Sequence, residues 1–179
     1  MITFQKIRWK NFLSTGDHWS EIDFQGNTTN LVVGTNGSGK STMLDALTFS
    51  LFNKPFRKVN KSQLINATNE KDCVVEVEFN VNNKNYLVRR SIKPNKFDIE
   101  VDGNLMHKES DDRINQKILE ENILKVNYKS FTQIVILGSS SFVPFMQLST
   151  SNRRDVIEDL LDIRIFSAMN TLIKEKIRT

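Results

Sequence analysis

The sequence predicts an α/β fold in which an antiparallel sheet accompanies a helix that follows a glycine-rich loop. Residues 72–106 predict the sheet, because apolar and polar residues alternate in Cys73–Val81 and the pattern returns after a turn at Asn82-Asn83. The loop and the helix are predicted where an apolar run ends at Gly34 and a helical period begins at Ser41. These observations predict strands and helices that share one core.

The other elements follow from hydrophobic period and turn residues. Strands are expected at residues 2–9, 19–24, 29–33, 86–92 and 97–101, with a short buried strand at 134–137, and helices at 41–52, 110–124 and 152–163, the last continuing from 165 to the end. Pro55 stops the first helix, Asp102-Gly103 is a hairpin turn, and Ser110 is a candidate helix cap.

Composition excludes several classes of protein. The chain has 179 residues, a formal net charge of +4 and one cysteine, so an intrachain disulfide is impossible and a reducing, cytoplasmic environment is expected. The alternation puts that cysteine, Cys73, on the buried face as a core thiol. No run approaches the ~20 apolar residues that span a bilayer, so no membrane partner is expected. The mild positive charge permits a nucleic-acid partner without arguing for one.

The phosphate loop, Gly34-Thr35-Asn36-Gly37-Ser38-Gly39-Lys40-Ser41, matches the pattern G-x-x-x-x-G-K-S/T without a mismatch. Its glycines let the backbone aim several N–H groups at a phosphate, and the following helix contributes its positive end. Lys40 is expected to reach the β- and γ-phosphates, Ser41 to coordinate Mg²⁺, and Thr42 to lie near the α-phosphate. The predicted cofactors are ATP and Mg²⁺. The candidate ligands are Asn36, Gly37, Ser38, Gly39, Lys40, Ser41 and Thr42.

A GTPase is disfavoured, although Asn95–Asp98 matches the N-K-x-D pattern of that class. Ile92-Lys93-Pro94 precedes this stretch in place of a long buried strand, and the D-x-x-G sequence Asp23–Gly26 lies before the phosphate loop, in the wrong order. A turn that leads into a strand is the preferred interpretation of Asn95–Asp98. A self-contained P-loop kinase acting on a small molecule stays open as an alternative.

Hydrolysis of ATP needs a second acid, which usually ends a run of four apolar residues. Ile134–Leu137 is such a run, but Gly138 and serines follow it, and no other run qualifies. The sequence therefore predicts a triphosphate cradle without the catalytic acid, which is half of an active site.

Several segments resemble the SMC-type and SbcC-type ATPases, which are ABC-like heads interrupted by a long coiled coil. The resemblance rests on Ile7–Ser14, Gly34–Thr42, Leu44–Leu47, Phe131–Leu137 and Arg153–Leu161. Lys54–Arg57 together with Pro144–Met146 is most similar to the bacteriophage members, the ATPase subunits of phage recombination endonucleases. A phage source would imply the host cytoplasm.

The resemblance implies an N-terminal lobe of an ABC-type P-loop head at residues 1–163 and the start of a coiled-coil helix at 164–179. The C-terminal lobe of the family supplies the acid, and ATP joins two heads to gate a partner nuclease in DNA recombination and double-strand-break repair. The implied partners are the chain's own C-terminal lobe, a second head, a nuclease subunit and double-stranded DNA. The runner-up is an SMC-like chromosome-organising ATPase or a gap-repair ATPase without a nuclease.

Two positions depart from the family pattern. Leu13 stands where the family has an arginine that reaches the nucleotide, and Ser139 stands where it has a glutamine that bridges Mg²⁺ and the attacking water. Gln133 lies earlier and is not accepted as a substitute, whereas Ser140 or a water bridge is an alternative to Ser139. Lys40 and Ser139 are the candidate catalytic residues, and Ser41 and Ser139 are the candidate Mg²⁺ ligands.

A basic cluster, Lys54, Arg57, Lys58 and Lys61, contains no acid and is the candidate contact for DNA phosphates. A solvated loop is the alternative interpretation of this cluster. His18 and His107 are isolated, so no metal site is predicted apart from that of the nucleotide's Mg²⁺.

Overall fold

The computed structural model describes residues 2–27, 29–106, 111–136, 143–161 and 163–178. The chain divides into two compact units, Met1–Leu119 and Glu120–Thr179. Within the described residues, no helix combines the length and the apolar character needed to cross a membrane.

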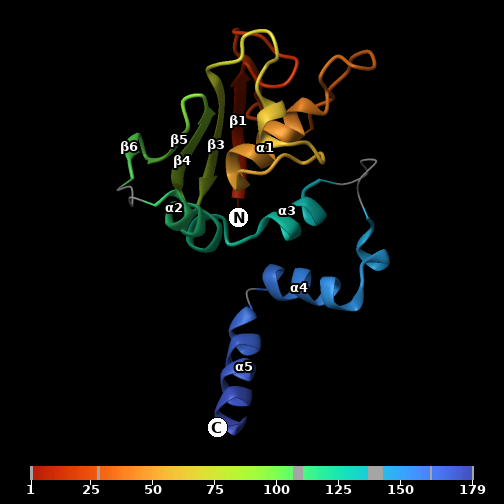
Figure 1. The fold of residues 1–179 in the computed structure, drawn as a ribbon, viewed down its shortest axis with the longest axis vertical. Coiled ribbons are helices and arrows are strands. Elements are labelled where there is room, and N and C mark those ends of the chain that lie inside the picture. Colours follow the sequence, from red (N-terminus) through yellow and green to blue (C-terminus); the bar gives the residue numbers. More distant parts are fainter. Residues whose placement is uncertain (1, 28, 107–110, 137–142, 162, 179) are drawn as a thin grey trace. The chain divides into compact units, whose positions relative to one another are not determined.

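The first unit is built on a six-stranded antiparallel sheet with the strand order β2-β1-β3-β4-β5-β6 (Figure 1). The strands are β1 Ile2–Lys10, β2 Ser20–Asp23, β3 Cys73–Val81, β4 Lys84–Ile92, β5 Lys96–Val101 and β6 Asn104–Leu105. Asn82 and Asn83, at φ 51° and 63°, form the tight turn between β3 and β4, and Asp102-Gly103 joins β5 to β6. The predicted meander is confirmed.

The two faces of the sheet differ as the alternation predicts. Ile7, Val77 and Val88 lie side by side in register and are fully buried on one face, against helix α1, Thr42–Phe52. The opposite face is polar. On it the nearly buried carboxylate of Glu76 accepts hydrogen bonds from Arg8 and from Arg89, the latter with 2.5 Å between Nε and Oε1.

Two polar side chains hold the end of α1 against β4 and α2, Asp112–Ile118. Arg90 Nε donates to the Ser50 carbonyl at 3.1 Å, and Gln116 Nε2 donates to the Leu51 carbonyl at 2.8 Å. These bonds satisfy carbonyls that the last turn of a helix leaves without an intrahelical partner. Asp111 caps α2 by accepting from the Arg113 amide at 2.8 Å, whereas the predicted cap, Ser110, lies outside the described residues. A π-helical stretch, η2 Leu119–Leu124, follows α2.

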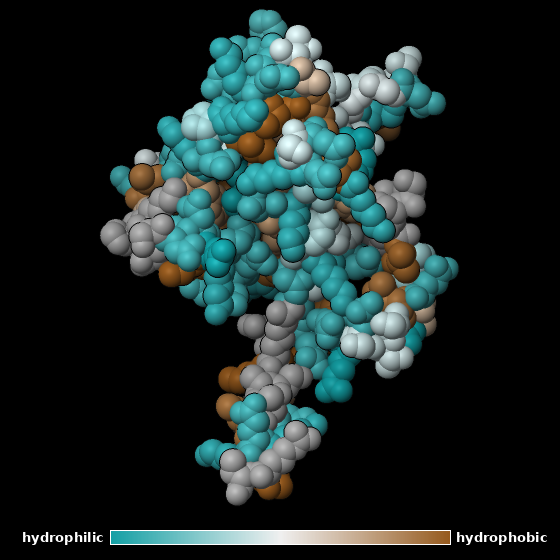
Figure 2. All heavy atoms as spheres, viewed as in Figure 1, coloured by the Kyte–Doolittle hydropathy of each residue, from teal (hydrophilic) through white to brown (hydrophobic). Residues whose placement is uncertain are grey.

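The second unit is helical. Its elements are α3 Tyr128–Ile134, the short η3 Phe145–Gln147, α4 Thr150–Leu160 and α5 Arg164–Arg178. Helices α3 and α4 pack together, and Lys129 Nζ binds Asn152 Oδ1 at 2.7 Å and Asp155 Oδ2 at 3.1 Å between them. The apolar side chains of α5 are exposed, as the brown surface of this helix in Figure 2 shows. They are Ile165, Phe166, Met169, Leu172, Ile173 and Ile177.

Two predicted strands are wrong. Thr29–Val33 is irregular, with Leu31 87% and Val33 80% exposed, because its apolar composition favours a strand but no strand of the described chain pairs with it. The run that starts at Ile134 ends a helix instead, because Asn127 accepts from the Ser130 amide at 2.9 Å and so caps α3 upstream. Leu137 lies outside the described residues.

Helices are confirmed at 41–52 and 110–124 within one or two residues. The predicted continuous helix from 152 to the end is interrupted, since α4 ends at Leu160 and α5 begins at Arg164.

Candidate functional site: a phosphate loop and its cavity

Positive backbone angles shape the phosphate loop. Gly37 has φ +84° and Gly39 has φ +94°, a region that side chains of L-residues disfavour. Gly34 differs from these two, because a Cβ at this position would lie 2.5 Å from Ser38 Oγ and the Ser38 hydroxyl would have to rotate away. The Ser38 amide donates to the Thr35 carbonyl at 3.2 Å and the Thr42 amide to the Gly39 carbonyl at 2.9 Å, which leads the loop into α1.

Several backbone amides of the loop have no acceptor among the described turns and loops. Among the hydrogen bonds of the described turns and loops, none is donated by the amides of Gly37, Gly39, Lys40 or Ser41. Ser41 occupies the N-cap of α1 but its side chain makes no capping hydrogen bond. Amides at the positive end of a helix, together with a hydroxyl at the same place, suit an anion and a cation bound to it.

Lys40 is exposed, and its ammonium is held by its own loop. Nζ donates to the Gly34 carbonyl at 2.6 Å and to the Thr35 carbonyl at 2.8 Å. An ammonium has three donors, so these two bonds fix the direction of the side chain and leave one donor for an anion.

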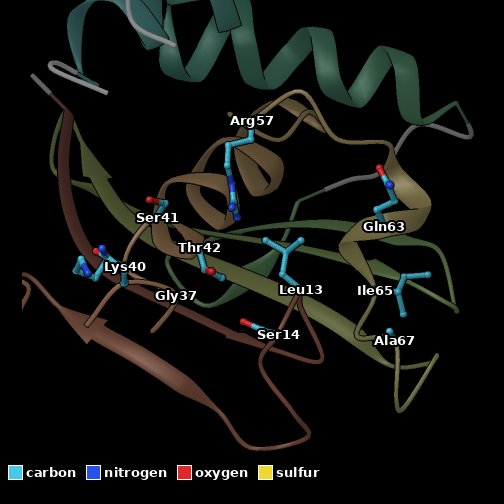
Figure 3. Close-up of a pocket in the computed structure, with 12 residues that line it drawn as sticks. Leu13, Ser14, Gly37, Lys40, Ser41, Thr42, Arg57, Gln63, Ile65 and Ala67 are labelled. Carbon is cyan, nitrogen blue, oxygen red and sulfur yellow. The ribbon is translucent and has the colours of Figure 1, made fainter. Parts of the chain in front are cut away.

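A cavity of about 520 Å³ opens beside the loop (Figure 3). All of the residues that line it come from the first unit. They are Leu13, Ser14, Asn36, Gly37, Gly39, Lys40, Ser41, Thr42, Arg57, Gln63, Ile65 and Ala67. In the close-up, Lys40, Ser41 and Gly37 lie on one side, Leu13 and Thr42 in the middle, and Gln63, Ile65 and Ala67 on the other side. The cavity is thus polar and cationic at the loop and largely apolar opposite it.

The wall near Leu13 is fixed by a network of amides. Leu13, at φ +53°, donates its amide to the Leu64 carbonyl at 2.6 Å and receives Asn66 Nδ2 on its own carbonyl at 3.1 Å. Asn11, which is 1% exposed, accepts Asn69 Nδ2 at 2.6 Å on its side-chain oxygen. These bonds join the loop after β1 to residues 64–69, so both segments face the cavity as one wall.

Arg57 lies at the cavity and is paired with a buried acid that sequence reasoning missed. Asp45, which is fully buried in the first turn of α1, accepts from Arg57 Nε at 2.6 Å and from the Arg57 amide at 2.9 Å. The signal in the sequence is weak, since it consists only of an acid inside a largely apolar helix and an arginine beyond Pro55.

The other predicted site residues are dispersed. Lys54 and Lys58 are exposed, whereas the Lys61 ammonium lies over the Phe49 ring, 5.8 Å from its centroid. Burial lowers the pKa of Lys61, and the charge of Arg90 lowers it further. Ser139 and Ser140 lie outside the described residues. No group of three or more histidine, cysteine or acidic residues that could hold a metal occurs in the described part of the chain.

Comparison with known proteins identifies the family to which the chain belongs. The sequence profile of the AAA domain family matches residues 6–178. Exonuclease subunit 2 of Escherichia phage RB69 is 42% identical over 173 residues, covering 97% of this chain and 31% of the relative. The DNA double-strand break repair Rad50 ATPase of Thermoplasma volcanium is 27% identical, covering 97% of this chain and 19% of the relative. The chain thus spans less than a third of the length of these curated relatives.

Solved structures agree on the fold. A chain from a structural study of ATP-driven dimerisation and DNA-stimulated activation of SMC ATPases superposes with a TM-score of 0.60 at 22% identity, covering 88% of this chain and 99% of that one. The predicted fold class and the resemblance to phage, Rad50 and SbcC-type ATPases are confirmed. The chain belongs to the AAA domain family, and its fold is that of an SMC-type ATPase head lobe.

Proposed function

We propose that this chain binds Mg²⁺ and ATP in the cavity beside the phosphate loop. The observation that carries the proposal is the convergence of the Lys40 ammonium, the loop amides and the start of α1 on one end of that cavity. Lys40 contacts the β- and γ-phosphates, Ser41 holds Mg²⁺, and Thr42 lies by the α-phosphate. Asn36, Gly37, Ser38 and Gly39 supply the cradle. Ser139 is the proposed second ligand of Mg²⁺ and helps to position the attacking water.

The chain acts as one half of a head, with residues 1–163 as the lobe and 164–179 as the start of a coiled coil. Supporting this, the apolar residues Leu31 and Val33 lie exposed just before the phosphate loop, where a strand from a second lobe would pair with them and cover them. That second lobe, which is the C-terminal half of the same ATPase, supplies the acid that activates water. A second head then closes over the γ-phosphate.

The complete protein is an ATPase whose ATP-driven head dimerisation gates a partner nuclease on double-stranded DNA, in recombination and double-strand-break repair. The names of the phage and Rad50 relatives support this assignment. Lys54, Arg57, Lys58 and Lys61 are the proposed contacts for DNA phosphates. The protein works in the cytoplasm, which is that of the host for a phage protein.

Calorimetric titration with ATP and Mg²⁺ tests the site, and Lys40→Ala is expected to abolish binding because the charge partner of the β- and γ-phosphates is lost. The half-head proposal predicts that the 179-residue chain alone neither turns over ATP nor dimerises with it. Adding the C-terminal half in trans is expected to restore both in turnover assays and light scattering. Robust turnover by the lone chain would instead support a self-contained P-loop enzyme.

A further inference from the structure

Asp45 and Arg57 form a pair with very unequal exposure. The Asp45 side chain is completely buried, whereas the Arg57 side chain is 46% exposed and lines the cavity beside the phosphate loop. Asp45 Oδ2 receives both Nε, at 2.6 Å, and Nη2, at 2.5 Å, and Oδ1 receives the Arg57 amide at 2.9 Å. A single buried carboxylate therefore fixes both the backbone and the guanidinium of Arg57.

This arrangement ties Arg57 to the phosphate loop mechanically. Asp45 is in the first turn of α1, whose amides begin where the loop ends. Arg57 is beyond the end of the same helix, after Pro55. The carboxylate thus joins the segment that follows α1 back to the beginning of α1, and a buried charge held this way is costly to leave without its partner.

The guanidinium keeps donors for a ligand. Arginine has five N–H donors, and Asp45 engages the Nε edge, so the Nη1 group is left for an anion. Figure 3 shows the Arg57 side chain extending from its backbone toward Thr42. Thr42 is in turn adjacent to Ser41 at the start of α1. The Nη1 group of Arg57 therefore lies at the cavity that the phosphate loop lines.

We propose that Asp45 is a positioning residue of the nucleotide site, which fixes Arg57 so that the guanidinium contacts the phosphates of the bound nucleotide. This inference rests on the proposed binding of ATP to the phosphate loop. Arg57 then belongs to the nucleotide site, and Lys54, Lys58 and Lys61 remain as the proposed contacts for DNA phosphates. Asp45 does not touch the nucleotide and acts only through Arg57.

The test is a double-mutant cycle of ATP affinity in the intact protein. Asp45→Asn keeps the side-chain size and an oxygen for the Arg57 amide, but removes the charge that holds the guanidinium. We expect Asp45→Asn and Arg57→Ala each to weaken ATP binding about tenfold, the effect of losing one charge-assisted contact, and the double variant to lose no more than Arg57→Ala alone. Additive losses would show that Asp45 acts independently of Arg57 and would overturn the proposal.

A matched pair on the sheet provides the control. Glu76, with 4% side-chain exposure, binds Arg89, which is 36% exposed, and also Arg8, but neither Glu76 nor Arg89 lines the cavity. Glu76→Gln and Arg89→Ala are expected to leave ATP affinity unchanged. If either variant loses as much ATP affinity as Asp45→Asn does, the effect of Asp45→Asn is general destabilisation and the proposal is overturned. If Asp45→Asn does not fold, Arg57→Gln tests the pair from its exposed side, and unchanged affinity in that variant overturns the proposal.

The outcomes separate this inference from the proposed function. If wild-type protein binds no ATP, the phosphate-loop proposal fails. If wild-type protein binds ATP, Lys40→Ala abolishes binding and Asp45→Asn matches wild type, only the role of Asp45 fails. A second readout is the dependence of DNA affinity on salt, in which Arg57→Ala is expected to keep the wild-type slope.

Discussion

The guanidinium of Arg90 lies over the ring of Phe97, with 3.8 Å between its central carbon and the ring centroid. Arg90 is 5% exposed, and besides its bond to the Ser50 carbonyl it donates Nη2 to Gln116 Oε1 at 2.6 Å. One side chain thus joins two strands of the sheet, the end of α1 and helix α2. A cation in this position is stabilised by the ring and by the acceptors around it.

Replacing Arg90 with lysine is expected to lower the free energy of unfolding by about 1–3 kcal/mol, because one ammonium cannot reach both acceptors and leaves a buried one unpaired. Urea unfolding followed by tryptophan fluorescence measures this, since Trp9 and Trp19 both belong to the first unit. The exposed Arg113→Lys serves as control and is expected to change stability by less than about 0.5 kcal/mol. Equal stability of the two variants would contradict the role of Arg90.

Gly34→Ala is expected to weaken ATP binding by less than about tenfold, because the Ser38 hydroxyl, which its Cβ would overlap, must rotate away. Adding Ser38→Ala removes that oxygen and should recover much of the affinity, although Ser38 Cβ would still lie 3.3 Å away. Gly16→Ala is the control, since no atom lies within 4 Å of a Cβ there. Calorimetric titration decides, and a loss in Gly34→Ala that Ser38→Ala leaves untouched would rule out this contact as its cause.

Burial raises the pKa of the Cys73 thiol to about 12, from the model-peptide value of 9.0, against a smaller opposing effect of Lys61. The folded state therefore keeps the proton that the unfolded state loses, and stability falls as the pH rises above about 9. We expect the stability advantage of wild type over Cys73→Ala to shrink by about 1.6 kcal/mol in all between pH 9 and 10.5. Urea midpoints at pH 7, 9 and 10.5 measure it. If the difference in stability between wild type and Cys73→Ala is the same at all three pH values, the pKa of the thiol lies near its ordinary value.

The basic cluster is expected to set the salt dependence of DNA binding in the assembled complex. Changing the three lysines of the cluster, Lys54, Lys58 and Lys61, together to alanine should lower DNA affinity and flatten the plot of log K against log salt, whose slope is about −0.9 per phosphate contacted. The exposed Lys54 and Lys58 should each account for about one contact, and Lys61 for less because its ammonium lies over Phe49. Lys84→Ala, at the start of β4, is the control. If the slope is unchanged in the triple-lysine variant, the cluster is only a solvated loop and does not contact DNA.

Local chemistry decided which elements could be predicted from the sequence. Cys73–Val81 and Asn82-Asn83 were predictable because alternation and a positive-φ turn act within a few residues. The phosphate loop was predictable for the same reason. Thr29–Val33 failed because a strand depends on a neighbour that a single sequence does not specify, and the run at Ile134 failed because a cap seven residues upstream, at Asn127, outweighs a preference for strand.

Parts of the candidate site are beyond such reasoning. Asp45 and Arg57 meet only because α1 ends and the chain returns after Pro55, and nothing in their spacing indicates an ion pair. Gln63 and Ile65 line the cavity because the hydrogen bonds of Asn66 hold their segment against the loop after β1. Such a tertiary contact leaves no periodic pattern in the sequence.

The strand order also has a consequence for how the chain folds. From β3 to β6, every strand pairs with its sequence neighbour across a short turn, so little chain entropy opposes these pairs. The pairing of β1 with β3 must instead close a long segment that contains the phosphate loop and all of α1. We therefore expect the β3–β6 hairpins to nucleate folding, with β1 docking in a slower step that Trp9 would report in stopped-flow refolding. The loop that receives the phosphates would then be among the last parts of the unit to take shape, so competence to bind nucleotide would mark the completion of folding.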